Sequence, residues 1–118
     1  MQGADFNAAE AKKAKQDGAV LVKNSGRGER KGDARLHGYL LDYKFTERKS
    51  FACNVEAFKK HEKDAWREGY EPIIIAIFDG YKDKSIAMID WEVLKNLFDE
   101  IIDLKDQLRD EEERRANE

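Results

Sequence analysis

Alternation of apolar and polar residues predicts the strands of this chain. Residues 33–46 alternate around His37-Gly38, which predicts a two-residue hairpin, because the glycine supplies the positive φ that such a turn needs. Residues 73–78 are a continuous apolar run, typical of a central strand buried on both faces. Residues 19–22 and 85–89 are short β-branched or apolar runs and predict two further strands.

Apolar residues three or four positions apart predict three helices. The first covers residues 6–16 and the second residues 55–67, with Asn54 as its N-cap and Gly69 as its stop. The third covers about 91–115. On the second helix the spacing marks one side for burial, with a glutamate among its members: Val55, Phe58, Glu62, Ala65 and Trp66.

This order of elements predicts an α/β fold in a single domain, residues 1–118, with a core of about 5–89. Helices flank a central mixed β-sheet, and the first half of the long C-terminal helix (about 91–115) is expected to dock on that sheet.

The pairing register of the predicted hairpin places two carboxylates opposite each other. With residues 37 and 38 as the turn, Asp33 lies opposite Asp42, and Lys44 shares their face. Two opposed carboxylates repel each other, and a divalent cation between them would turn that repulsion into a binding site. The alternative is a surface Asp–Lys ion pair, which contributes only about 0–1 kcal/mol. The other face of the hairpin is expected to be core: Tyr39, Leu41, Tyr43 and Phe45.

Composition narrows the possible classes. Of the 118 residues, 41% are hydrophobic and 40% charged, which indicates a small core and a highly charged surface. The single cysteine, Cys53, excludes an internal disulfide and a cysteine-based zinc site, and is expected to be a small buried residue. With no apolar leader and no apolar run longer than 73–78, we expect a cytoplasmic protein with no membrane association.

Charge is unevenly distributed along the chain. Residues 1–67 hold 15 Lys/Arg and 10 Asp/Glu, a net +5, whereas residues 68–118 hold 7 and 15, a net −8. The overall net charge of −3 therefore conceals a basic half around the hairpin.

Two basic segments could contact phosphates. The glycines of residues 23–32 match neither the dinucleotide-binding nor the Walker spacing, so this loop is either a phosphodiester-binding loop or a solvated one. On the second helix, Lys59, Lys63 and Arg67 recur every four residues, and this column is either a phosphate-gripping face or simply a solvated one.

Together these features resemble the PD-(D/E)xK nuclease superfamily, and within it the archaeal-type and phage Holliday-junction resolvases. Asp33 resembles the first acidic motif and Asp42-Tyr43-Lys44 the D/E-x-K element, in its less common Asp form. Glu10 occupies the place of a further acid on the first helix. The pieces Ser25-Gly26 and Lys31-Gly32-Asp33 and the run 58–78 are also similar to that group.

The resemblance implies a restriction-endonuclease-like fold and a site for Mg²⁺ or Mn²⁺. Asp33, Asp42 and the Tyr43 carbonyl would ligate the ion, with Glu10 ligating directly or through water, and Lys44 would orient the attacking water. Hard oxygen donors without cysteine or paired histidines fit these ions rather than zinc. The implied DNA contacts are Ser25, Arg27, Arg30, Lys31 and Arg35, besides Lys59, Lys63 and Arg67.

The function implied is that of a metal-dependent endonuclease that cleaves branched DNA in recombination or repair. It would act as a homodimer, so that two opposed strands are cut together. The compact form favours a virus-encoded protein acting in the host cytoplasm. Two alternatives remain open: a restriction- or repair-type duplex endonuclease, and a non-catalytic nucleic-acid or protein interaction module. His37 is expected to be a turn residue and His61 a helix-face residue, neither with a catalytic role.

Overall fold

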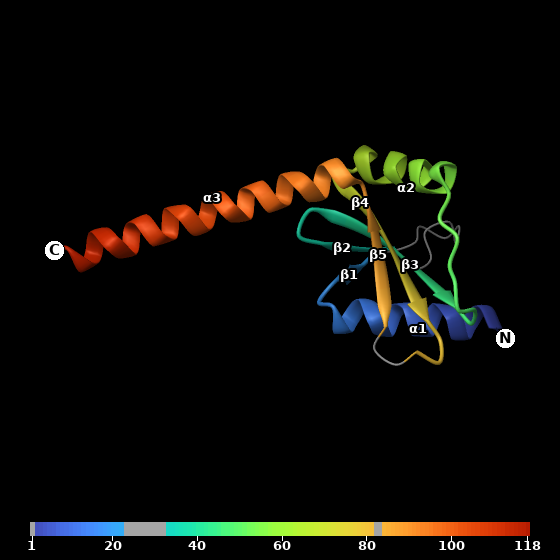
Figure 1. Cartoon of the computed structure of the whole chain (residues 1–118). Helices are drawn as coiled ribbons and strands as arrows, with labels where there is room; N and C mark the ends of the chain where they lie inside the picture. The colour runs from blue at the N-terminus through green and yellow to red at the C-terminus, as the bar shows by residue number, and fades with distance from the viewer. Residues whose placement is uncertain (1, 23–32, 82–83) are drawn as a thin grey trace. The chain divides into compact units, whose positions relative to one another are not determined.

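The computed structural model describes residues 2–22, 33–81 and 84–118. The predicted order of elements is confirmed and can be followed along the chain in Figure 1. The first helix begins earlier than expected, at Gln2 rather than at residue 6. The elements are α1 (Gln2–Gln16), β1 (Val20–Leu21), β2 (Asp33–Leu36), β3 (Tyr39–Thr46), α2 (Val55–Arg67), β4 (Glu71–Phe78), β5 (Ser85–Ile89) and α3 (Trp91–Ala116).

The described strands form one mixed sheet in the order β1-β2-β3-β4-β5. β2 is antiparallel to both β1 and β3, whereas β3 and β4 are parallel. The turn between β2 and β3 has φ of 49° at His37 and 85° at Gly38, two positive values as a type I′ turn requires. This turn sets the predicted register, and Asp33 is indeed the cross-strand partner of Asp42.

Pro72 lies inside β4, where a missing N–H would normally break a ladder. The Glu71 N–H donates to the Gly38 carbonyl at 3.1 Å, so the odd-numbered N–H groups of β4 face β3. The Phe78 N–H donates to the Lys84 carbonyl at 3.4 Å, so the even-numbered groups face the other edge. The proline therefore removes no hydrogen bond between β3 and β4.

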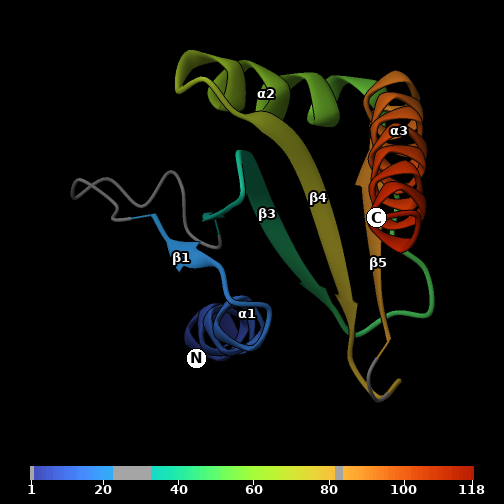
Figure 2. The same ribbon diagram turned by 90° about the vertical axis from the view of Figure 1, so that its left-hand side faces the viewer.

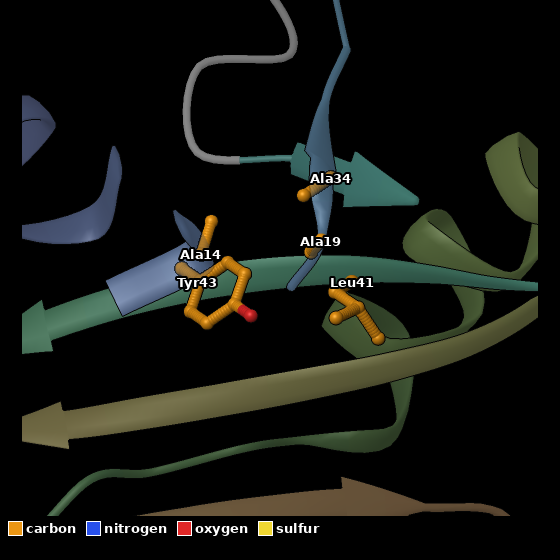
Figure 3. Packing of buried hydrophobic residues seen from close by; sticks show 5 residues of the cluster. All are labelled: Ala14, Ala19, Ala34, Leu41 and Tyr43. Atoms are coloured by element: carbon orange, nitrogen blue, oxygen red, sulfur yellow. The ribbon is translucent and has the colours of Figure 1, made fainter. Parts of the chain in front are cut away.

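Small residues let α1 pack closely on one face of the sheet. Ala14 of α1 lies against Tyr43 of β3, and Ala34 lies close to Ala19 (Figure 3). The Tyr43 hydroxyl donates to the Asp17 carboxylate at 2.8 Å and so joins β3 to the residue that follows α1. The core face predicted for the hairpin is confirmed for Leu41 and Tyr43, which are buried, while Tyr39 and Phe45 are partly buried.

α2 lies on the opposite side of the strands from α1 (Figures 1 and 2). Its predicted ends are confirmed: the Asn54 side chain accepts from the Ala57 N–H at 2.7 Å, and Gly69, with φ of 80°, follows the C-cap.

The predicted buried side of α2 is partly wrong. Val55 and Trp66 are 69% and 58% exposed, and the buried residues are His61 and Ala65. The Leu40 carbonyl of β3, which lies beneath α2, accepts a hydrogen bond from His61. The helix therefore turns a polar side chain inward.

α3 is a long amphipathic helix capped by Asp90, whose side chain accepts from the Glu92 N–H at 2.9 Å. Residues Ile89–Glu118 form one compact unit and residues Met1–Met88 another. No residue of α3 is buried. The docking of its first half on the sheet stays a prediction. Within the first unit, α1 packs against β1 and β3, and α2 packs against β3 and β4. Among the described helices, none combines the length and apolar character that a membrane span requires.

Candidate metal centre

The hairpin places the side chains of Asp33 and Asp42 as close together as a sheet allows. Residues that flank a two-residue turn form a hydrogen-bonded pair, and such pairs alternate with non-hydrogen-bonded ones along the strands. Asp33 and Asp42 fall on a non-hydrogen-bonded pair, where Cα atoms are only about 4.5 Å apart. Asp33 is 7% exposed and the Asp42 side chain 13%. Two carboxylates thus share one largely buried spot.

Lys44 lies on the same face, as predicted. Its Nζ is 3.3 Å from Asp42 Oδ2, while its side chain is about half exposed. The cation therefore pairs with one of the two acids and still reaches solvent, where a substrate phosphate or a water could contact it.

His61 joins the two acids from α2. A ring nitrogen of His61 and one carboxylate oxygen of each aspartate all lie within 4.8 Å of one another. His61 lies on a face of α2 as expected, but that face is the buried one, and the residue is only 5% exposed. The sequence did carry an indication of this burial. His61 precedes Ala65 by four residues, so both lie on the same side of α2, and that side is buried.

Glu10, the further acid expected on α1, is not part of the group formed by the two aspartates and His61. Its carboxylate is largely buried and accepts a hydrogen bond from the backbone N–H of Phe45. Burial raises the pKa of Glu10 above its usual value, the Phe45 N–H and Lys44 partly oppose that rise, and Asp42 adds to it. The charges of Asp42 and Lys44 thus act on Glu10, even though its helix covers the other face of the sheet.

The backbone of β3 explains how Glu10 comes close. Because Gly38 and the even-numbered residues of β3 bond to β4, the odd-numbered backbone groups face the β2 edge. The Tyr43 carbonyl and the Phe45 N–H therefore point to the same edge. The carbonyl expected to ligate a metal lies on the edge that Glu10 reaches.

A pocket of about 210 Å³ opens over this cluster. Its lining includes Lys60, a cation that the sequence reasoning did not select, and Cys53, which is exposed rather than buried as expected. The full lining is Asp33, Asp42, Lys44, Phe51, Cys53, Ala57, Lys60, His61, Asp64 and Ile74.

Among the residues that the structure describes, the expected DNA-binding side chains do not line this pocket. The column Lys59, Lys63 and Arg67 is exposed on α2 and absent from the lining. Arg35 donates to Glu68 Oε1 at 2.8 Å, and its guanidinium lies 5.6 Å from the Tyr70 ring centre. Four further candidates lie outside the described residues: Ser25, Arg27, Arg30 and Lys31.

The donor set suits a divalent cation. Asp33 and Asp42 offer hard carboxylate oxygens at one spot, and Glu10 lies within electrostatic reach of Asp42. His61 adds a nitrogen to this oxygen-rich set. Comparisons of the chain with protein-family models, with curated proteins and with solved structures found no match.

Proposed function

We propose that this chain is a divalent-metal-dependent endonuclease that hydrolyses phosphodiester bonds in DNA. The observation that supports it most is the cross-strand pair Asp33–Asp42, with Lys44 on the same face. Like charges directly opposite each other destabilise a hairpin, and a cation bound between them removes that cost. Local pairings that cost stability occur in folded proteins mainly at functional sites.

Asp33 and Asp42 would hold Mg²⁺ or Mn²⁺, with the Tyr43 carbonyl at the adjoining strand edge and Glu10 of α1 ligating directly or through water. When bound, such an ion polarises a phosphoryl oxygen and lowers the pKa of a coordinated water. Lys44 orients the attacking water and stabilises the negative charge that develops on the phosphate. Its pairing with Asp42 keeps the ammonium at the mouth of the pocket.

The substrate proposed is branched DNA, and the active form a homodimer. Both follow from the resemblance of the Asp33, Asp42-Tyr43-Lys44 and Glu10 positions to Holliday-junction resolvases. The net charge of +5 on residues 1–67 supports a polyanionic substrate for the half of the chain that carries the centre. Two centres in a two-fold dimer would cut opposed strands of a junction together.

The test is cleavage of a four-way junction and of a linear duplex with the same arm sequence, in Mg²⁺, Mn²⁺ or EDTA. We expect metal-dependent nicks in the junction, abolished by Asp33→Asn, Asp42→Asn or Lys44→Ala while junction binding is retained. Asp103→Asn, an exposed acid on α3, is the matched control and should cut normally. Full activity of an Asp33 or Asp42 variant would contradict the proposal, and so would metal-independent cleavage. Equal cutting of the duplex would replace the junction preference by a general duplex activity.

A further inference from the structure

The ring of His61 is anchored to β3 by a hydrogen bond to a backbone carbonyl. Nε2 lies 2.8 Å from the Leu40 carbonyl oxygen, and because a carbonyl only accepts, Nε2 must carry the proton and donate it. Nδ1 then keeps a free lone pair on the ring. Histidines that bind metals almost always donate their other ring N–H to a carboxylate or a backbone carbonyl, which fixes the tautomer. The Leu40 carbonyl serves that purpose here.

The spacing of the donor atoms suits a shared ion. A six-coordinate cation with bonds of about 2.1 Å holds adjacent ligands about 3 Å apart and opposite ligands about 4.2 Å apart. The donor atoms of Asp33, Asp42 and His61 lie within 4.8 Å of one another, so small side-chain rotations bring all three onto one ion.

We propose that His61 is a ligand of this centre and that its nitrogen makes the centre prefer Mn²⁺ to Mg²⁺. The inference rests on the proposed function in taking Asp33 and Asp42 as ligands. Mg²⁺ binds oxygen donors in near-ideal octahedral geometry and gives up its waters reluctantly. Imidazole is a ligand for the first-row transition ions, and Mn²⁺ joins that series while still accepting carboxylates. A mixed set of two carboxylates and one imidazole therefore favours Mn²⁺.

The experiment measures metal binding to the full chain, stripped with EDTA and without DNA. Mn²⁺ and Mg²⁺ affinities are determined by calorimetry, and pulsed electron paramagnetic resonance of bound Mn²⁺ detects any coupling to ¹⁴N. The main variant is His61→Gln, because the glutamine amide can still donate to the Leu40 carbonyl but lacks the ring nitrogen. The control is His37→Asn, since the chain's other histidine lies in the exposed turn at φ 49°, which asparagine tolerates.

We expect ¹⁴N coupling in the unmodified protein and in His37→Asn, and none in His61→Gln. His61→Gln should also weaken Mn²⁺ binding by about 10-fold or more, since mutating even a group that hydrogen-bonds to a metal ligand costs that much affinity. Its Mg²⁺ affinity should change much less. Mn²⁺ bound at this centre without nitrogen coupling would overturn the inference and leave the carboxylate site intact. That result is read from the unmodified protein and does not depend on the folding of a variant.

The same data separate the inference from the nuclease proposal. A chain that binds neither ion contradicts both. A chain that binds Mn²⁺ with ¹⁴N coupling but cleaves no DNA supports the His61 ligand and contradicts the nuclease.

Discussion

The repulsion between Asp33 and Asp42 can be measured directly with a double-mutant cycle. The cycle compares the unmodified protein, Asp33→Asn, Asp42→Asn and the double variant, all nearly isosteric. Either single change removes the whole repulsion between the two carboxylates, so making the second change brings no further gain in stability from that source. The double variant should therefore be less stable than the sum of the two single effects predicts.

The magnitude follows from the geometry. Two unit charges separated by 4.8 Å, the upper limit for the carboxylate oxygens, repel by about 3.5 kcal/mol at an effective dielectric constant of about 20. Lys44 lies 3.3 Å from Asp42, and the pocket admits solvent, so both reduce the repulsion. We expect a coupling free energy of about 1–2 kcal/mol in the metal-free protein.

The assay is urea unfolding in EDTA at pH 7, repeated with saturating Mn²⁺. At a metal concentration 100 times the dissociation constant, binding adds about 2.7 kcal/mol to the unmodified protein. The single variants lose a ligand and gain much less, so the sign of the coupling should reverse. A coupling free energy near zero in EDTA would show that the carboxylates do not act as charged neighbours, and the electrostatic reason for a cation here would be lost.

Three further changes test other contacts. Burial raises the pKa of Glu10, so ionising its carboxyl group lowers the stability of the folded protein as the pH rises above 4.5. Without metal, Glu10→Gln should therefore unfold at the same urea concentration as the parent near pH 4 and at a higher one at pH 7. Equal urea midpoints at pH 7 would contradict this. Tyr43→Phe removes the hydrogen bond to Asp17 and should lower the free energy of unfolding by about 1 kcal/mol. It should bind Mn²⁺ as the parent does, because the expected ligand is the main-chain carbonyl. Weaker Mn²⁺ binding would contradict that assignment. Asn54→Ala should cost about 1 kcal/mol in thermal unfolding, and an unchanged melting temperature would show that the cap contributes nothing.

Sequence reasoning succeeded where the signal was local. The turn His37-Gly38 determines the register of β2 and β3, so the pairing of Asp33 with Asp42 followed from counting. Asn54 and Gly69 mark the ends of α2 by the conformations that they favour, and both positions are confirmed. These features depend on a few neighbouring residues and need no knowledge of the packing.

Features that depend on packing were missed. Val55 and Trp66 are more apolar than His61, yet His61 is buried, because the sheet beneath α2 offers it the Leu40 carbonyl. Periodicity identifies the sides of a helix but not what each side will meet. The inclusion of Lys60 in the pocket lining, instead of the Lys59 column, has the same origin.

The two-residue turn also limits how the hairpin could vary in length. A hydrogen-bonded pair must flank such a turn, and Asp33 and Asp42 must remain a non-hydrogen-bonded pair on the α2 face. One residue added to a single strand, without a bulge, would send one aspartate to the opposite face. If one residue were added to each strand and the two aspartates stayed a non-hydrogen-bonded pair, the pair beside the turn would also be non-hydrogen-bonded, which a two-residue turn does not allow. The hairpin can therefore be extended only in steps of two residues per strand, so insertions of four are the ones that preserve the carboxylate pair.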